Sequence, residues 1–194
     1  TLHAGGKFDD SAYKTSGGLH GVGSSVVNAL STYMDVKISR DGAVHHDRYE
    51  RGIPVVELED GLLPVIGKTK KTGTCVNFLP DPTIFEKTRF KEEEIKSRLH
   101  ETAYLNPELT IIFTDKRKTQ EERIEYHEPD GIIGFIKDLN SKKEVIHDPV
   151  YYKGEAEGIE VEVAFQYVNE FHENVLGFCN NIYNAEGGTH LTGF

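Results

Sequence analysis

A cluster of glycines near the start of the chain constrains the fold more than any other feature of the sequence. Four glycines fall between positions 17 and 23, and an apolar run with helical spacing follows at once. Glycine is useful where the backbone must take a positive φ or approach a ligand closely. Ser24 and Ser25 are suitable caps for the expected helix. Its apolar face comprises Val26, Val27, Leu30, Tyr33 and Met34.

A glycine loop that opens directly into a helix presents free N–H groups and the positive end of the helix dipole to an anion, so phosphate is the expected ligand. Two common phosphate loops do not fit. The dinucleotide fingerprint is G-x-G-x-x-G, whereas the order here is Gly18-x-x-Gly21-x-Gly23. A Walker A loop is approached at residues 61–69, but one residue too many separates its glycines, and Pro64 removes an N–H.

Composition limits the classes of protein to which the chain can belong. It has 194 residues, 37% apolar and 28% charged, which is enough for one or two globular domains. The net charge of −10 argues against a dedicated polyanion binder, so any contact with DNA needs a local basic patch or a partner. Cys75 and Cys179 indicate reduced thiols. Without a long apolar run or a signal peptide, we expect a cytoplasmic protein and no membrane contact.

The pattern of apolar and turn residues predicts an α+β fold. Asp41-Gly42 is a strong hairpin signal, and Asp130 is expected to cap a helix at the best candidate domain boundary. We expect strands at 36–39, 44–49, 72–79, 109–115, 123–127, 150–152, 159–167 and 174–182, and further helices at 90–104 and from 132 onward.

Two polar clusters carry alternative interpretations. His45-His46 suggests a metal site, but adjacent strand residues point to opposite faces and no third ligand lies at a suitable spacing, so surface histidines are preferred. Lys68, Lys70 and Lys71 form a small basic cluster, which we interpret as a solvated loop rather than a nucleic-acid patch.

Several motifs in order along the chain resemble bacterial type II topoisomerase ATPase subunits, the B subunits of DNA gyrase and topoisomerase IV. Residues 2–9 and 13–23 resemble the ATP-lid region of that family. The resemblance continues through these segments: Lys71-Thr72-Gly73-Thr74, Thr114-Asp115-Lys116-Arg117, Asn180-Asn181-Ile182 and Gly187-Gly188-Thr189-His190-Leu191-Thr192-Gly193-Phe194.

The resemblance implies the second half of a GHKL (Bergerat-type) ATPase α/β sandwich over residues 1–129. The start of a ribosomal-S5-like transducer domain is expected over residues 130–194. Because Thr1 and Phe194 read like interior positions, we expect an internal fragment of a longer subunit.

The resemblance also implies a set of residues that contact ATP. Lys7 is expected near the phosphates, Tyr13 near the adenine, and Thr74 on the floor of the adenine pocket. His20 is expected to act through its backbone rather than as a general base. No catalytic residue or metal ligand is assigned, since the family's glutamate and asparagine lie upstream. The full set is Gly6, Lys7, Tyr13, Gly18, Leu19, His20, Gly21, Val22, Gly23 and Thr74.

The parent protein implied by this resemblance binds ATP with Mg2+ and dimerises on binding it. It couples hydrolysis to DNA strand passage with the topoisomerase A subunit, in an A2B2 assembly. Negative supercoiling and decatenation both remain open. Two alternatives are another GHKL ATPase, of the chaperone or mismatch-repair type, and a non-catalytic dimerisation or interaction module. The fragment alone is not expected to turn over ATP.

Overall fold

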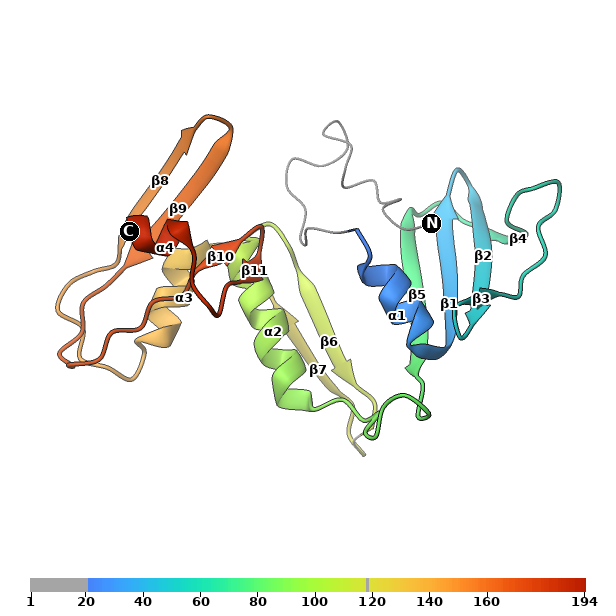
Figure 1. The fold of residues 1–194 in the computed structure, drawn as a ribbon, viewed down its shortest axis with the longest axis horizontal. Coiled ribbons are helices and arrows are strands. Elements are labelled where there is room, and N and C mark those ends of the chain that lie inside the picture. Colours follow the sequence, from blue (N-terminus) through green and yellow to red (C-terminus); the bar gives the residue numbers. More distant parts are fainter. Residues whose placement is uncertain (1–20, 118) are drawn as a thin grey trace. The chain divides into compact units, whose positions relative to one another are not determined.

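The computed structural model describes residues 21–117 and 119–194, and Figure 1 shows the elements they form. The chain divides into two compact units between Arg89 and Phe90, and each contains both helices and strands. The α+β class is therefore confirmed. The domain boundary expected between residues 129 and 130 stays a prediction. Within the described residues, no helix combines the length and apolarity needed to cross a membrane.

An antiparallel sheet with strands of unequal length forms the body of the first unit. Strands run in the order β3-β2-β1-β5, and β4 also pairs with β2. Asp41 and Gly42 have φ values of 52° and 82° and form the tight turn between β1 and β2, which confirms the expected hairpin. The strands are β1 (Ser31–Arg40), β2 (Ala43–Glu50), β3 (Ile53–Pro54), β4 (Val65–Lys68) and β5 (Gly73–Pro80).

The register of this sheet assigns each side chain to one of two faces. Paired residues of antiparallel strands share a face, and alternate residues of a strand return to it. Ile38 is paired with Thr74 and Met34 with Phe78, so these residues belong to one largely apolar face. The other face carries the polar rows of the sheet, built from Tyr33, Asp35 and Lys37 of β1 and their partners Glu50, Arg48 and His46 of β2.

Helix α1 (Gly23–Ala29) is shorter than the sequence predicts. Strand β1 begins at Ser31, so Tyr33 and Met34 lie on a strand and the helical assignment of these two residues was wrong. The N-cap is Val22, which forms no side-chain capping bond, so Ser24 and Ser25 do not cap the helix. Tyr33 and Met34 are paired with β2 on one side and with β5 on the other, and this pairing overrides the local helical spacing.

The described residues of the second unit form three hairpins and three helices. The expected helix at 90–104, the hairpin at 109–127 and the helix after Asp130 are confirmed. The single strand expected at 174–182 is wrong, because Asn180 and Asn181, with φ values of 47° and 64°, turn the chain between two short strands. The elements are α2 (Glu92–Leu105), β6 (Ile111–Asp115), β7 (Glu122–Tyr126), α3 (Gly131–Leu139), β8 (Val150–Ala156), β9 (Ile159–Phe165), β10 (Phe178–Cys179), β11 (Ile182–Tyr183) and α4 (Thr189–Gly193).

An aromatic cluster joins the elements of the second unit. The Tyr104 ring of α2 stacks on Phe135 of α3, with centroids 5.1 Å apart, and Phe135 also approaches Phe178 of β10. His100 lies between Tyr104 and Tyr126, at 4.6 and 4.9 Å. Burial raises the pKa of Tyr104 to about 12. Each such ring pair adds about 0.5–1.5 kcal/mol to the stability, beyond the contribution of the area it buries. Tyr104 and Tyr126 are also buried, so this cluster forms the core of the unit.

A buried carboxylate ties the first unit together. Asp81 follows β5 and is only 1% exposed. It accepts hydrogen bonds from Arg51 Nε at 2.7 Å, from the Thr83 hydroxyl at 2.7 Å and from the Thr83 N–H at 2.9 Å. The bond from Arg51, followed by those from Thr83, lowers the pKa of Asp81 to about 2. The Asp81 N–H donates to the Leu30 carbonyl, so the ends of α1, β2 and β5 meet here.

We expect Asp81→Asn to destabilise the first unit at neutral pH and to change its acid unfolding. Because the folded pKa of Asp81 is depressed from 3.8 to about 2, its contribution is present above pH 4 and lost as the pH falls toward 2. The free energy of unfolding by urea, measured between pH 2 and pH 7, should therefore fall less on acidification in Asp81→Asn than in the unaltered protein. Asp41→Asn is the control, since its partner Arg40 and Asp41 itself are both exposed. Equal behaviour of the two variants would contradict this role.

Replacing Gly131, at the start of α3, tests how tightly the second unit is packed. Gly131 is buried at φ 56°, and a Cβ there would lie 3.0 Å from Pro107 Cγ. Gly158 has φ 77° and open space around its Cβ position. A positive φ costs an alanine about 1–2 kcal/mol at either site. Gly131→Ala should therefore lower the free energy of unfolding more than Gly158→Ala, by about 1 kcal/mol or more. Equal losses in urea titrations would show that Pro107 gives way freely.

Candidate functional site

The start of α1 holds the three residues of the expected phosphate loop that the structure describes. Gly21 has φ 63°, a left-handed conformation that favours glycine, and Val22 follows in a helical conformation. The first helical bond runs from the Val26 N–H to the Val22 carbonyl, at 2.9 Å. The N–H groups of residues 23–25 precede that bond, and within the described residues no side-chain cap is formed at this end of the helix. This arrangement suits an anion held by main-chain donors.

The other residues expected around the loop fall into two groups. Gly6, Lys7, Tyr13, Gly18, Leu19 and His20 lie outside the described residues. Thr74 is the second residue of β5, exposed and paired with Ile38. Helix α1 contacts β1, and in Figure 1 it descends alongside the sheet, so its N-terminus faces the end at which β5 begins. Gly73, immediately before Thr74, has no side chain to obstruct a ligand over this part of the strand.

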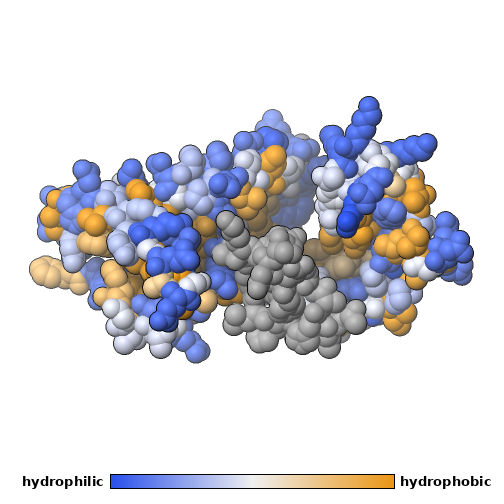
Figure 2. Space-filling model, turned by 90° about the horizontal axis from the view of Figure 1, so that it is seen from above, coloured by the Kyte–Doolittle hydropathy of each residue, from blue (hydrophilic) through white to orange (hydrophobic). Residues whose placement is uncertain are grey.

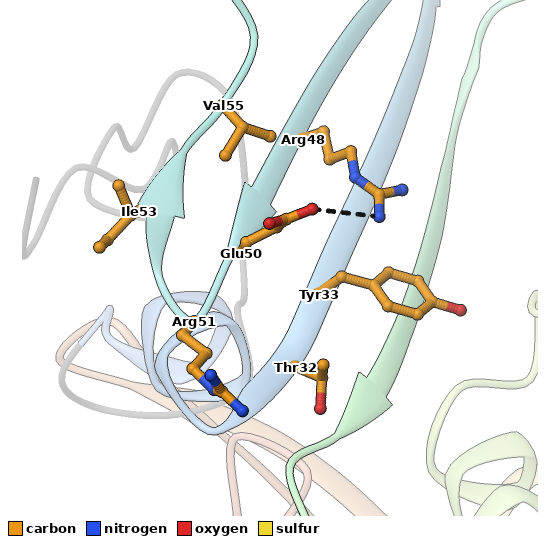
Figure 3. Close-up of a pocket in the computed structure, with 7 residues that line it drawn as sticks. All are labelled: Thr32, Tyr33, Arg48, Glu50, Arg51, Ile53 and Val55. Carbon is orange, nitrogen blue, oxygen red and sulfur yellow. Dashed lines mark ion pairs between the residues drawn. The ribbon is translucent and has the colours of Figure 1, made fainter.

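A pocket on the first unit lies on the face of the sheet opposite to Thr74 (Figure 3). The Arg48 guanidinium lies 5.0 Å from the centroid of the Tyr33 ring and 3.6 Å from Glu50. The charges lining the pocket are therefore largely paired, and Arg51 is held by Asp81. Of the expected ATP-contacting residues, none of the four that the structure describes, Gly21, Val22, Gly23 and Thr74, lines it. The lining residues are Thr32, Tyr33, Arg48, Glu50, Arg51, Ile53 and Val55.

The two adjacent histidines of β2 point to different surroundings. His46 Nε2 lies 2.8 Å from Asp35 Oδ2, and this bond holds the pKa of Asp35 below its usual range. His45 lies on the other face, with Nδ1 3.4 Å from the Leu63 carbonyl. In residues 21–117 and 119–194, no three side chains of metal-binding type converge.

Two further segments of the resemblance are held by polar contacts that the sequence analysis did not predict. Arg117 donates to both oxygens of Asp115, which is 4% exposed, and to the Phe90 carbonyl. The Asn181 amide donates to Asn106 Oδ1 at 2.9 Å. The spacing Asp115-x-Arg117 could have predicted the first of these contacts from the sequence. Residues 106 and 181 are too far apart in sequence for any local pattern to join them.

Comparison with known proteins places these features in a family. A family model described as DNA gyrase B matches residues 131–194. The chain is 51% identical over its whole length to the B subunit of DNA gyrase from Streptococcus pneumoniae, and covers 29% of it. It is 50% identical to the B subunit of DNA topoisomerase 4 from the same species, with 99% of this chain and 29% of that protein covered.

A solved structure supports the same relationship. The crystal structure of the 43K ATPase domain of Thermus thermophilus gyrase B, in complex with an aminocoumarin, matches with a TM-score of 0.76 and 36% identity. The match covers 89% of this chain and 46% of that one. The chain thus spans less than a third of the length of the curated relatives quoted above. It belongs to the family of bacterial type II topoisomerase B subunits that includes those of DNA gyrase and topoisomerase IV.

Proposed function

We propose that this chain supplies the phosphate loop and the adenine-pocket floor of the ATP site in a type II topoisomerase B subunit. The likeness to the ATPase domain of T. thermophilus gyrase B carries the proposal, since it covers 89% of this chain. The whole protein uses ATP binding and hydrolysis to drive DNA strand passage. Supercoiling and decatenation are both compatible with nearly equal identities of 51% and 50% to the two kinds of relative.

Each described site residue has a distinct physical role in this proposal. Gly21 supplies a left-handed bend that lets the backbone approach a phosphate closely. The N–H groups of residues 23–25 then donate to phosphate oxygens, assisted by the helix dipole. Thr74 presents a hydroxyl toward the base. The resemblance adds Lys7 as a contact to the phosphates and Tyr13 as a contact to the adenine.

The bound nucleotide supplies the triphosphate that is cleaved, and Mg2+ neutralises its charge. The residues of this chain bind and orient it, because the resemblance puts the general base and the metal ligand upstream. We further propose that the parent dimerises on binding ATP and acts on DNA together with the topoisomerase A subunit, in an A2B2 assembly. The cytoplasm is the proposed location.

ATP turnover tests the proposed activity directly. We expect the full-length protein to hydrolyse ATP, and DNA together with the A subunit to stimulate the rate. The 194-residue chain alone should not turn over ATP, because the resemblance puts the general base and the metal ligand outside these residues. Strand passage by the complete assembly is measured as a change in the linking number or catenation of plasmid DNA. An inactive full-length assembly would refute the proposal.

Replacing Gly21 with valine should weaken ATP binding by the full-length protein about tenfold or more. A β-branched residue pays at least about 1–2 kcal/mol for a positive φ, and about 1.4 kcal/mol corresponds to a factor of ten. The dissociation constants of ATP and adenosine are compared by calorimetry. ATP should lose more affinity than adenosine, since the loop contacts phosphate.

The matched control is Gly61→Val. Gly61 has φ 79° and open space at its Cβ position, so it carries the same backbone cost in a turn outside the site. Its nucleotide affinity should be unchanged. Unaltered ATP binding in Gly21→Val, or equal losses in both variants, would remove the phosphate loop from the site.

Replacing Thr74 with valine tests the adenine side separately. Valine keeps the shape and the strand preference of threonine but removes the hydroxyl, and one lost hydrogen bond corresponds to about 0.5–1.5 kcal/mol. We therefore expect ATP and adenosine to lose affinity by a similar factor, about three- to tenfold. A loss confined to ATP would place Thr74 at the phosphates. No loss for either ligand would exclude Thr74 from the site.

A further inference from the structure

Three lysines gather at one end of the sheet in the first unit. Sheet order places β4 and β5 on opposite sides of the β1–β2 hairpin. Residues 69–72, which join β4 to β5, must therefore cross the tip of that hairpin, at the upper end of the sheet in Figure 1. The Thr69 N–H donates to the Gly42 carbonyl at 3.0 Å and fixes the crossing. Lys68, Lys70 and Lys71 therefore lie at this end of the sheet. Figure 2, which looks at the molecule from above, shows hydrophilic side chains that project from the first unit.

The backbone of the crossing segment is ordered by local bonds, so the positions of the lysines are defined. Lys68 is the last residue of β4 and pairs with Ala43 of β2. The Lys71 N–H donates to the Thr69 hydroxyl at 3.0 Å and closes a turn. The cluster is therefore presented on a supported turn next to the Asp41-Gly42 hairpin.

The positive charge of this cluster is not neutralised by the described residues around it. None of the three lysines forms an ion pair within residues 21–117 and 119–194, and Asp41 at the same end is paired with Arg40. Elsewhere this acidic chain uses glutamates to pair with Lys91, Lys96 and Lys153. Single lysines without an ion pair also occur, but here three lie within four residues.

Position and charge together suit a polyanion. Three like charges held close together repel one another, and phosphates of a nucleic acid relieve that repulsion while releasing condensed counterions. The sequence alone favoured a solvated loop, because it did not show that the segment crosses the tip of a hairpin beside Arg40. A chain with a net charge of −10 requires such a local basic patch if it is to contact DNA.

We propose that Lys68, Lys70 and Lys71, which we call the tip lysines, contact the phosphate backbone of double-stranded DNA. The contact rests on the proposed function, in which the parent protein acts on DNA. It is independent of base sequence, because lysine ammonium groups reach phosphates as point charges. It adds a DNA-contacting surface to the unit that carries the ATP site.

The test is the salt dependence of DNA binding by the full-length protein. The variant is Lys68→Gln with Lys70→Gln; Lys71 is left intact because it belongs to the segment Lys71-Thr72-Gly73-Thr74, which carries the proposed adenine contact. Binding of a fluorescein-labelled duplex of about 40 base pairs is followed by anisotropy between about 50 and 200 mM KCl. Each lost phosphate contact lowers the slope of log K against log salt by roughly 0.9. The slope should therefore become shallower by about 2, with weaker binding at the lowest salt concentration.

The matched control is Lys87→Gln with Lys137→Gln, which removes the same charge from two exposed lysines outside the cluster. Its slope should match that of the unaltered protein. An unchanged slope in the tip variant, or an equal change in the control, would overturn the inference. ATP hydrolysis without DNA is measured for all three proteins. If the unaltered protein lacks it, the proposed function fails; if it hydrolyses ATP but the slopes do not differ, only the tip contact fails.

Discussion

The antiparallel pairing of β1 with both β2 and β5 is the constraint on which the rest of the first unit depends. It fixes Thr74 opposite Ile38 and sends Arg48 and Glu50 to the other face. A shift of one residue would exchange the two faces, because side chains alternate along a strand. Together with the pairing of β4 with β2, it places β4 and β5 on either side of a hairpin, so the segment with the tip lysines crosses the end of that hairpin. The proposed nucleotide and DNA contacts thus both depend on one register.

Asp81 makes that register robust at the opposite end of β1. Its carboxylate receives Arg51 from the β2–β3 turn, and its N–H bonds the Leu30 carbonyl between α1 and β1. A charge buried to this degree is costly unless every oxygen is bonded, and here three donors satisfy it. Helix α1 is thereby tied to the sheet at its C-terminal end, away from the N–H groups that begin it.

The elements fixed by local chemistry could be predicted from the sequence. Asp41-Gly42 marks its hairpin because few residue pairs accept two positive φ values in succession. The end of α1 could not be located this way, since Tyr33 and Met34 fit a helical period as well as a strand and only pairing with distant strands decides. Asn180 and Asn181 were missed for a related reason. Asparagine tolerates the left-handed conformation without requiring it, so the turn is visible only in the folded chain.

The features of the candidate site also divide into those that a local motif reveals and those that only the fold brings together. The glycine loop is a local motif, and its bend at Gly21 follows from composition. The bond between Arg51 and Asp81 joins residues thirty positions apart, and the tip lysines acquire meaning only from sheet order. The glycine loop and the tip lysines represent two different ways in which an acidic chain can bind anions. Main-chain N–H groups suit a compact triphosphate at short range because they add no net charge. A long polyanion instead requires exposed ammonium groups, gathered where the described residues form no ion pair with them.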